Sequence, residues 1–151
     1  MVAGISGDRT QHLLWRLQNG NYASSHPKLL VLTIGVNNFN EDSGEETADG
    51  IKLLLDWLKV NMPQTKVLLI GPLPTGLHPN SSNRIKYDIV HSIIKNYKSP
   101  QVTYLPLTQY FIKQDGELDT NYCSGDGIHL IEPGYALWAS LLKEAVEEIL
   151  K

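Results

Sequence analysis

The sequence predicts an α/β fold with a parallel β-sheet, and three observations support this prediction. Short apolar runs begin near residues 29 and 66, which is typical of strands buried on both faces, and a third, shorter strand is predicted from residue 102. Segments with apolar residues at helical spacing separate these strands, and a glycine follows each of the first two strands. Strands that alternate with helices form parallel sheets with helices on both faces. We therefore expect residues 1–151 to form a single domain.

The first residues of the chain have the pattern expected part-way through such a fold. Residues 1–6 look like the last part of a strand that enters a loop. Asp8 or Thr10 can cap a helix that follows, and Gly20 is a typical helix stop. The sequence thus predicts a first helix between about residues 10 and 20.

Two strands and a helix are predicted next. The run from Leu29 to Ile34 predicts a strand buried on both faces, and residues 66–70 repeat this pattern. Between them, Ser43 and Glu46 have the spacing of a capping box, which predicts a helix that continues to about residue 61.

The second half predicts two more helices and one short strand. Isoleucines at helical spacing predict a helix whose inner face contains Ile85, Ile89, Ile93 and Ile94. Residues 102–105 form a third strand. A long loop then reaches Pro133, which favours the first turn of a last helix. The inner face of that helix is expected to contain Leu137, Leu141, Leu142, Val146 and Ile149.

The loop before the last helix contains the most informative residues. Asp126 and His129 are three positions apart and flanked by glycines. A histidine titrates near neutral pH, and a neighbouring carboxylate can fix its tautomer and stabilise the imidazolium, as in hydrolytic triads. An ordinary Asp-Gly turn with a histidine near a helix start explains the same residues equally well.

Composition excludes some classes of function. The net charge is −3 and there is no long basic run, so we expect no nucleic-acid partner. No run of residues is apolar over the length of a membrane span, and no signal peptide is visible. With Cys123 as the single cysteine, these features predict a cytoplasmic protein. There is no cluster of metal ligands and no phosphate-binding glycine loop, so we expect no metal and no cofactor.

Three ordered motifs together resemble a known family. Gly-Ile-Ser-Gly-Asp-Arg-Thr at residues 4–10, Ile-Gly-Val-Asn-Asn at residues 34–38 and Asp-Gly-Ile-His-Leu at residues 126–130 resemble the second, third and fifth sequence blocks of the SGNH (GDSL) hydrolases. The Leu-Trp-Arg-Leu segment at residues 14–17 resembles platelet-activating-factor acetylhydrolase catalytic subunits.

The resemblance implies a fold, an activity and four site residues. It implies a flavodoxin-like, three-layer α/β/α fold and the hydrolysis of acetyl or other short acyl esters. Asp126 would orient His129, the general base. Gly7, through its backbone N–H, and Asn37, through its side-chain amide, would form the oxyanion hole. In isolation, Gly7 could simply permit a turn and Asn37 could be a strand-end cap.

The first block of the family, a strand that ends in Gly-Asp-Ser with the nucleophilic serine, has no counterpart in the sequence. We therefore expect an N-terminally incomplete domain that lacks the first strand and most of the second. A buried aliphatic side chain contributes about 1.5–3 kcal/mol, so a missing central strand is costly. A homo-oligomer or a complementing N-terminal segment should cover the edge from Leu29 to Ile34.

Two functional hypotheses remain open at this point. In the first, the chain is an SGNH-type esterase for small ester substrates, and another segment supplies its nucleophile. In the second, it is a catalytically inactive family member that binds a partner. Ser6, Ser124 and Cys123 are alternative nucleophiles, but nothing in their spacing directs them toward His129.

Overall fold

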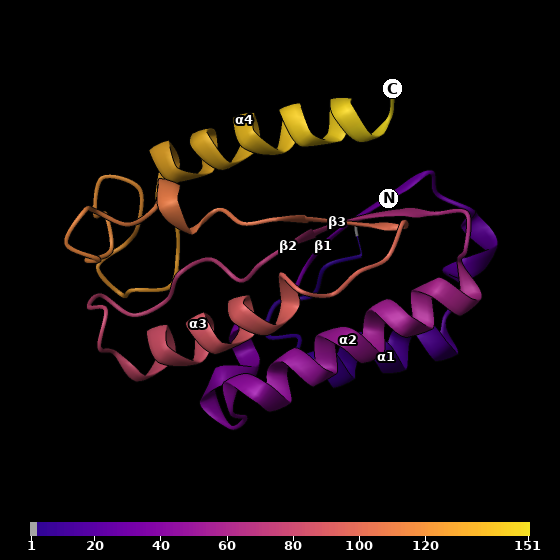
Figure 1. Ribbon diagram of the computed structural model, residues 1–151, viewed down its shortest axis with the longest axis horizontal. Helices are drawn as coiled ribbons and strands as arrows, with labels where there is room; N and C mark the ends of the chain where they lie inside the picture. The colour runs from indigo at the N-terminus through magenta and orange to yellow at the C-terminus, as the bar shows by residue number, and fades with distance from the viewer. Residues whose placement is uncertain (1–2) are drawn as a thin grey trace.

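The computed structural model describes residues 3–151 and confirms the predicted α/β fold with a parallel sheet (Figure 1). The sheet has three strands in the order β1-β2-β3, and neighbouring strands are parallel. The strands are β1 (Leu29–Thr33), β2 (Lys66–Ile70) and β3 (Val102–Leu105). All three predicted strands are therefore present, with β1 ending one residue before the predicted boundary.

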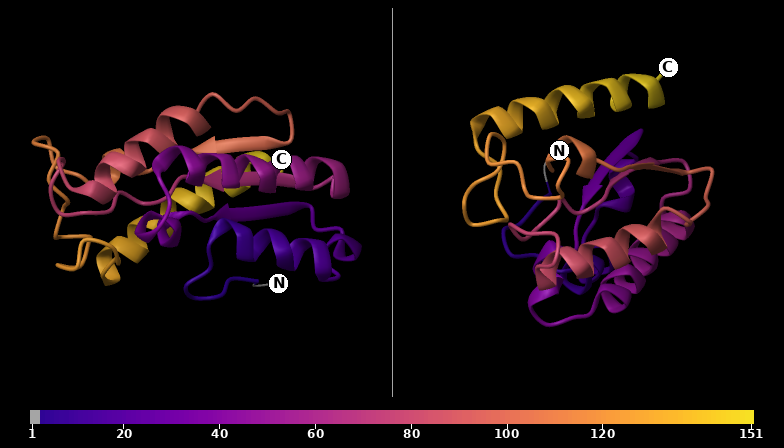
Figure 2. Two further views of the ribbon diagram at one scale, coloured as in Figure 1. Left: turned by 90° about the horizontal axis from the view of Figure 1, so that it is seen from below. Right: turned by 60° about the vertical axis from the view of Figure 1, so that its left-hand side comes forward.

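Helices form a layer on each face of this sheet, as the views in Figures 1 and 2 show. One layer contains α1 (Thr10–Asn19), α2 (Gly44–Asn61) and α3 (Ser82–Ile94), and the other contains α4 (Glu132–Ile149). Three short 3-10 helices complete the set: η1 (Ala23–Ser25), η2 (Val36–Asn40) and η3 (Thr108–Tyr110). None of the helices within residues 3–151 has both the length and the apolar character needed to cross a bilayer.

Strand β2 divides the hydrophobic core between the two layers. Val67 and Leu69 pack with the helices of the α1 to α3 layer, whereas Leu68 and Ile70 pack with the residues beneath α4. Successive side chains of a strand point to opposite faces, so a continuous apolar run is required where both faces are covered. The prediction of a buried strand at residues 66–70 is confirmed.

Helix α2 begins with the predicted capping box. The backbone N–H of Glu46 donates to the Ser43 hydroxyl at 3.1 Å, and the Glu46 carboxylate accepts from the Ser43 N–H at 2.8 Å. The predicted inner face of α3 was correct for Ile94, which is buried, and for Ile93, which packs against the core, but it was wrong for Ile85. The helix buries Arg84, Tyr87, Val90 and Ile94, while Ile85 is exposed.

Two expectations for the beginning of the chain were also wrong. Residues 3–6 are irregular and form no strand, and the first two residues lie outside the described range. Helix α1 does begin at Thr10, but Asp8 does not cap it. The Asp8 carboxylate instead forms an ion pair with Arg16, one turn and a half into the helix. This pair fixes the loop that contains Gly7 against α1.

Strand β1 is less buried than predicted. It has β2 as its only strand partner among residues 3–151, and only Leu32 is buried. Val31 is 44% exposed. The apolar sequence of β1 is therefore that of a central strand, while its position in the described structure is at an edge.

Candidate active site

The turn that contains Asp126 and His129 is held together by three hydrogen bonds to one carboxylate. The backbone N–H groups of Ile128 and His129 donate to Asp126 Oδ1 at 2.8 and 3.0 Å. The His129 ring approaches Asp126 Oδ2 through Nδ1 at 2.6 Å. The local sequence favours this turn because an aspartate side chain readily accepts from backbone N–H groups two and three residues later.

This arrangement favours the ionised form of Asp126 and selects one tautomer of a neutral His129. The hydrogen bond from the His129 ring, followed by the two backbone N–H groups, holds the pKa of Asp126 well below its usual range. An ionised carboxylate can only accept, so the proton of a neutral His129 is on Nδ1. Nε2 is then free to accept a proton. A histidine in this state is suited to general-base chemistry.

A second loop supports the turn from beneath. Gly127 lies between the two side chains in a left-handed conformation, with φ of +73°. Its carbonyl accepts a 2.8 Å hydrogen bond from the backbone N–H of Gly76, in the loop after β2. A Cβ atom at Gly127 would lie 3.3 Å from the Leu77 nitrogen, so the two loops are closely packed. Glycine at this position satisfies both the backbone conformation and the contact.

The loop before α1 and the segment after β1 bring Gly7 and Asn37 into one region. Gly7 has a φ of +81°, and the space where its Cβ would be is empty. Asn37 lies in η2, directly after β1, and its side-chain amide donates to the Asp8 carbonyl at 2.9 Å. An amide NH₂ has two hydrogens, so a second donor remains on Asn37.

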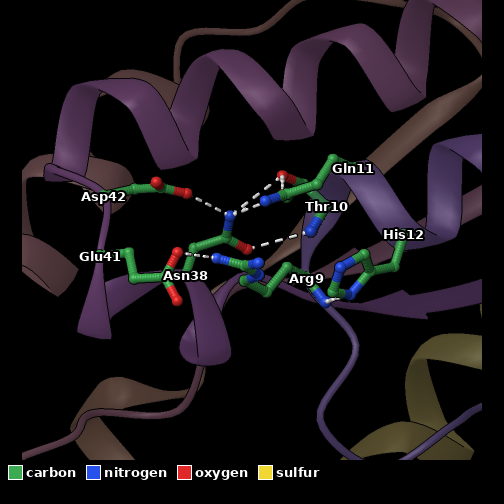
Figure 3. A network of polar contacts seen from close by, with 7 residues as sticks. All are labelled: Arg9, Thr10, Gln11, His12, Asn38, Glu41 and Asp42. Carbon is green, nitrogen blue, oxygen red and sulfur yellow. Dashed lines mark hydrogen bonds and ion pairs between the residues drawn. The ribbon is translucent and has the colours of Figure 1, made fainter.

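Asn38 anchors these two segments to each other (Figure 3). Its side chain is buried and accepts the first N–H of α1, from Thr10, at 3.0 Å. Three acceptors share the two hydrogens of its amide nitrogen: Thr10 Oγ1, Gln11 Oε1 and Asp42 Oδ2, at 3.2, 3.1 and 2.6 Å. No role was predicted for Asn38 from the sequence, although it lies beside Asn37 in the motif at residues 34–38.

The predicted site residues meet at one large cavity of about 1020 Å³. Gly7, Asn37 and His129 all line it, whereas Asp126 does not line it and is connected to it through its hydrogen bond with His129. All five residues of β1 line it as well, together with Leu13 and Leu17 of α1 and with Tyr135 and Trp138 of α4. The cavity is therefore continuous with the unpaired edge of β1.

The alternative nucleophiles differ in their surroundings. Cys123 is buried, and burial raises the pKa of its thiol to about 11, so the reactive thiolate is not formed at neutral pH. The Ser124 hydroxyl accepts from the Asp126 N–H at 3.4 Å. Ser6 lines the cavity. Within residues 3–151, neither serine hydroxyl forms a hydrogen bond with His129.

Two further polar groups lie in or beneath the site loops, and no function was predicted for either from the sequence. His78 and Glu117 form an exposed pair with 2.7 Å between His78 Nδ1 and Glu117 Oε2. Arg84 is buried beneath the same loops. No grouping of three or more His, Cys, Asp or Glu side chains in the described part of the chain could hold a metal ion.

Comparisons with known proteins agree with this architecture. Solved structures of similar fold include a GDSL-like lipase from Bacteroides thetaiotaomicron, with a TM-score of 0.78, 22% identity, and coverage of 97% of this chain and 74% of the other. An acetyl xylan esterase has a TM-score of 0.72 and 18% identity, with 95% and 79% covered. At these identities the likeness shows the fold.

Several proteins are more similar to this chain in sequence than these structures are. Platelet-activating factor acetylhydrolase IB subunit alpha2 of Rattus norvegicus is 35% identical over 150 residues, which cover 98% of this chain and 64% of the relative. The human subunit alpha2 gives the same values. The chain thus spans less than two thirds of the length of these relatives. The model of the GDSL-like lipase/acylhydrolase family matches residues 1–137, and the chain therefore belongs to this family of SGNH hydrolases.

Proposed function

We propose that this chain provides the acid–base and oxyanion residues of an ester hydrolase that acts on acetyl or other short acyl esters. The observation that supports the proposal most directly is the geometry around His129. Its Nδ1 is bound to Asp126, and its ring lines the cavity that Gly7 and Asn37 also line. The names of the relatives and of the acetyl xylan esterase agree with small acyl groups as substrates.

In this proposal each of the four residues has a defined role in the reaction. His129 Nε2 accepts the proton of the attacking hydroxyl and returns it to the leaving alcohol, while Asp126 keeps the ring in the required tautomer. The Gly7 N–H and the free Asn37 amide hydrogen donate to the oxyanion. One such donor typically lowers the barrier by about 3–4 kcal/mol.

We further propose that the serine nucleophile belongs to a segment outside these 151 residues. That segment would pair with β1 and occupy the cavity, because every residue of β1 lines the cavity, with side chains of α1 and α4 beside it. Apolar side chains such as Val31 would then be covered. A second copy of the chain at this edge is the other arrangement that fits. A cytoplasmic location stays a prediction.

A catalytically inactive binding module is the second candidate. The observation that favours it is that the described serine hydroxyls make no hydrogen bond with His129. An inactive chain would retain the turn as a structural element.

A fluorophosphonate probe, which reacts with activated serines, separates the two candidates. The purified protein is labelled and read by intact mass, beside His129→Ala and the control His78→Ala. His78 is a matched control because it is also exposed and bound to a carboxylate at 2.7 Å. The proposal predicts an adduct that is lost in His129→Ala and retained in His78→Ala.

The mass of the labelled species identifies the serine. An adduct on a co-purifying segment supports an external nucleophile, and an adduct on this chain points to Ser6 or Ser124 instead. A folded sample without any adduct, even after the natural flanking segments are supplied, would contradict the esterase proposal and favour the binding module.

A further inference from the structure

Arg84 is a buried cation without a carboxylate partner in the described part of the chain. It lies in the first turn of α3 and is 3% exposed. One terminal guanidinium nitrogen donates to the Gly116 carbonyl at 2.8 Å, and the other donates to the Gly76 carbonyl at 2.9 Å. Arginine is rarely buried without a partner, because desolvation of its charge is costly. The packing of α3 alone does not explain why a charged side chain is buried here.

The two carbonyls belong to loops that are far apart in sequence. Gly76 is in the loop between β2 and α3, and Gly116 is in the long segment between β3 and α4. A third contact joins the same loops, since the Leu118 N–H donates to the Leu77 carbonyl at 2.9 Å. The planar guanidinium presents its donors in a fixed fork, so it sets the separation of the two carbonyls.

Gly76 connects Arg84 to the Asp126 turn through its two backbone hydrogen bonds. Gly76 accepts from Arg84 through its carbonyl and donates through its N–H to the Gly127 carbonyl at 2.8 Å. Gly127 is the residue between Asp126 and Ile128, whose N–H binds the Asp126 carboxylate. Two consecutive hydrogen bonds therefore connect the buried guanidinium to the backbone of the turn that holds His129.

We propose that Arg84 is a positioning residue that sets the geometry of the Asp126 and His129 pair through Gly76 and Gly127. This inference rests on the proposed function, in which that pair is the acid–base group. Arg84 does not line the cavity and does not touch the reacting atoms. It acts by fixing the loop on which the turn is built.

The test is the tautomer of His129, read from the ¹⁵N shifts of its ring by NMR in the absence of substrate. This measurement needs no nucleophile, so it is independent of catalysis. Arg84→Met removes both hydrogen bonds while keeping an unbranched side chain. Arg84→Lys keeps the charge without the fork and serves if the Met variant does not fold. Val90→Ala is the control, because Val90 is a 1% exposed residue of the same helix that makes no bond to either loop.

We expect wild-type His129 to be mainly the Nδ1–H tautomer at a pH where it is neutral. Arg84→Met and Arg84→Lys should lower that population, and the Asp126 carboxyl carbon should titrate nearer to its ordinary range. Val90→Ala should keep the wild-type tautomer although it lowers the melting temperature. In a sample that reacts with the fluorophosphonate probe, the labelling rate should fall about 10- to 100-fold for the Arg84 variants, as a misplaced catalytic group predicts.

Two results would overturn the inference and are distinguishable. A wild-type tautomer in a folded Arg84 variant, or an equal loss in Val90→Ala, would refute the role of Arg84 and leave the proposed function intact. A wild-type protein without the Nδ1–H preference would refute the acid–base pair itself, and the role of Arg84 with it.

Discussion

Strands β1 and β2 have the same length and nearly the same apolar character, yet their surroundings differ greatly. Four of the five residues of β2 are buried, while β1 buries only Leu32. Strand β2 has a neighbour on each side, whereas β1 pairs only with β2 within residues 3–151. An apolar run thus indicates that a strand can be central in a sheet, but the neighbouring chain decides whether it is buried.

The candidate site is divided between these two parts of the molecule. The Asp126 turn is attached to the packed part, through the loop after β2 and Arg84. Gly7 and Asn37 belong to the open part, at the edge formed by β1 and the loop before α1. We therefore expect the acid–base pair to be formed in the chain as it is, while the cavity needs a covering segment.

The largest expected difference concerns two leucines in neighbouring strands. Leu69→Ala in β2 should lower the free energy of unfolding by about 2–5 kcal/mol, because Leu69 is 1% exposed and the change leaves a cavity. Leu30→Ala in the half-buried β1 should lower the free energy of unfolding by about 1 kcal/mol, because folding removes less apolar area of this side chain from water. Urea unfolding of both variants measures the difference. Equal costs would show that β1 is covered in solution.

Asn38→Ala should have the next largest effect, about 2–3 kcal/mol, because it leaves the Thr10 N–H and other buried groups without partners. The exposed Asn40 in the same 3-10 helix offers a matched control, and Asn40→Ala should change stability by less than about 0.5 kcal/mol. Thermal unfolding measures both. If the two variants are equally stable, the network in Figure 3 does not anchor the loop before α1.

A smaller effect is expected at the start of α2, in the packed part. Ser43→Ala removes the cap on the Glu46 N–H and should cost about 1 kcal/mol in urea unfolding. Ser82→Ala, at an exposed position in α3, is the control and should be nearly neutral. A neutral Ser43→Ala would indicate that water replaces the cap.

The smallest expected effect is a pH dependence. Asp126 has a lowered pKa in the folded chain, so its contribution to stability is complete above its ordinary value of about 4 and is lost as the pH falls toward the folded value. The stability difference between wild type and Asp126→Asn should therefore shrink as the pH falls below about 4, where urea unfolding of both proteins measures it. A difference that does not shrink below pH 4 would contradict the hydrogen bonds to this carboxylate.

The features that the sequence predicted well are local. The capping box of Ser43 and Glu46 and the turn at Asp126 each depend on residues two or three positions apart, so their pattern is visible in the chain. The pairing of β1 with β2 and the hydrogen bond from Arg84 to Gly116 depend on residues more than thirty positions away. Such contacts leave no periodic pattern. The inner face of α3 was partly misjudged for a related reason: its isoleucines have helical spacing, but Arg84 and Tyr87 pack against the loops and the core.

The most direct test of the central claim is hydrolysis of p-nitrophenyl acetate by this chain with and without a segment of the kind that we propose carries the nucleophile. The chain is co-expressed with the part of the rat acetylhydrolase subunit that its match leaves out, and His129→Ala is measured in parallel. We expect the co-expressed complex to hydrolyse the ester about a thousandfold faster than the chain alone, and we expect His129→Ala to abolish this increase. A folded complex that hydrolyses the ester no faster than the chain alone, or equally fast without His129, would contradict it.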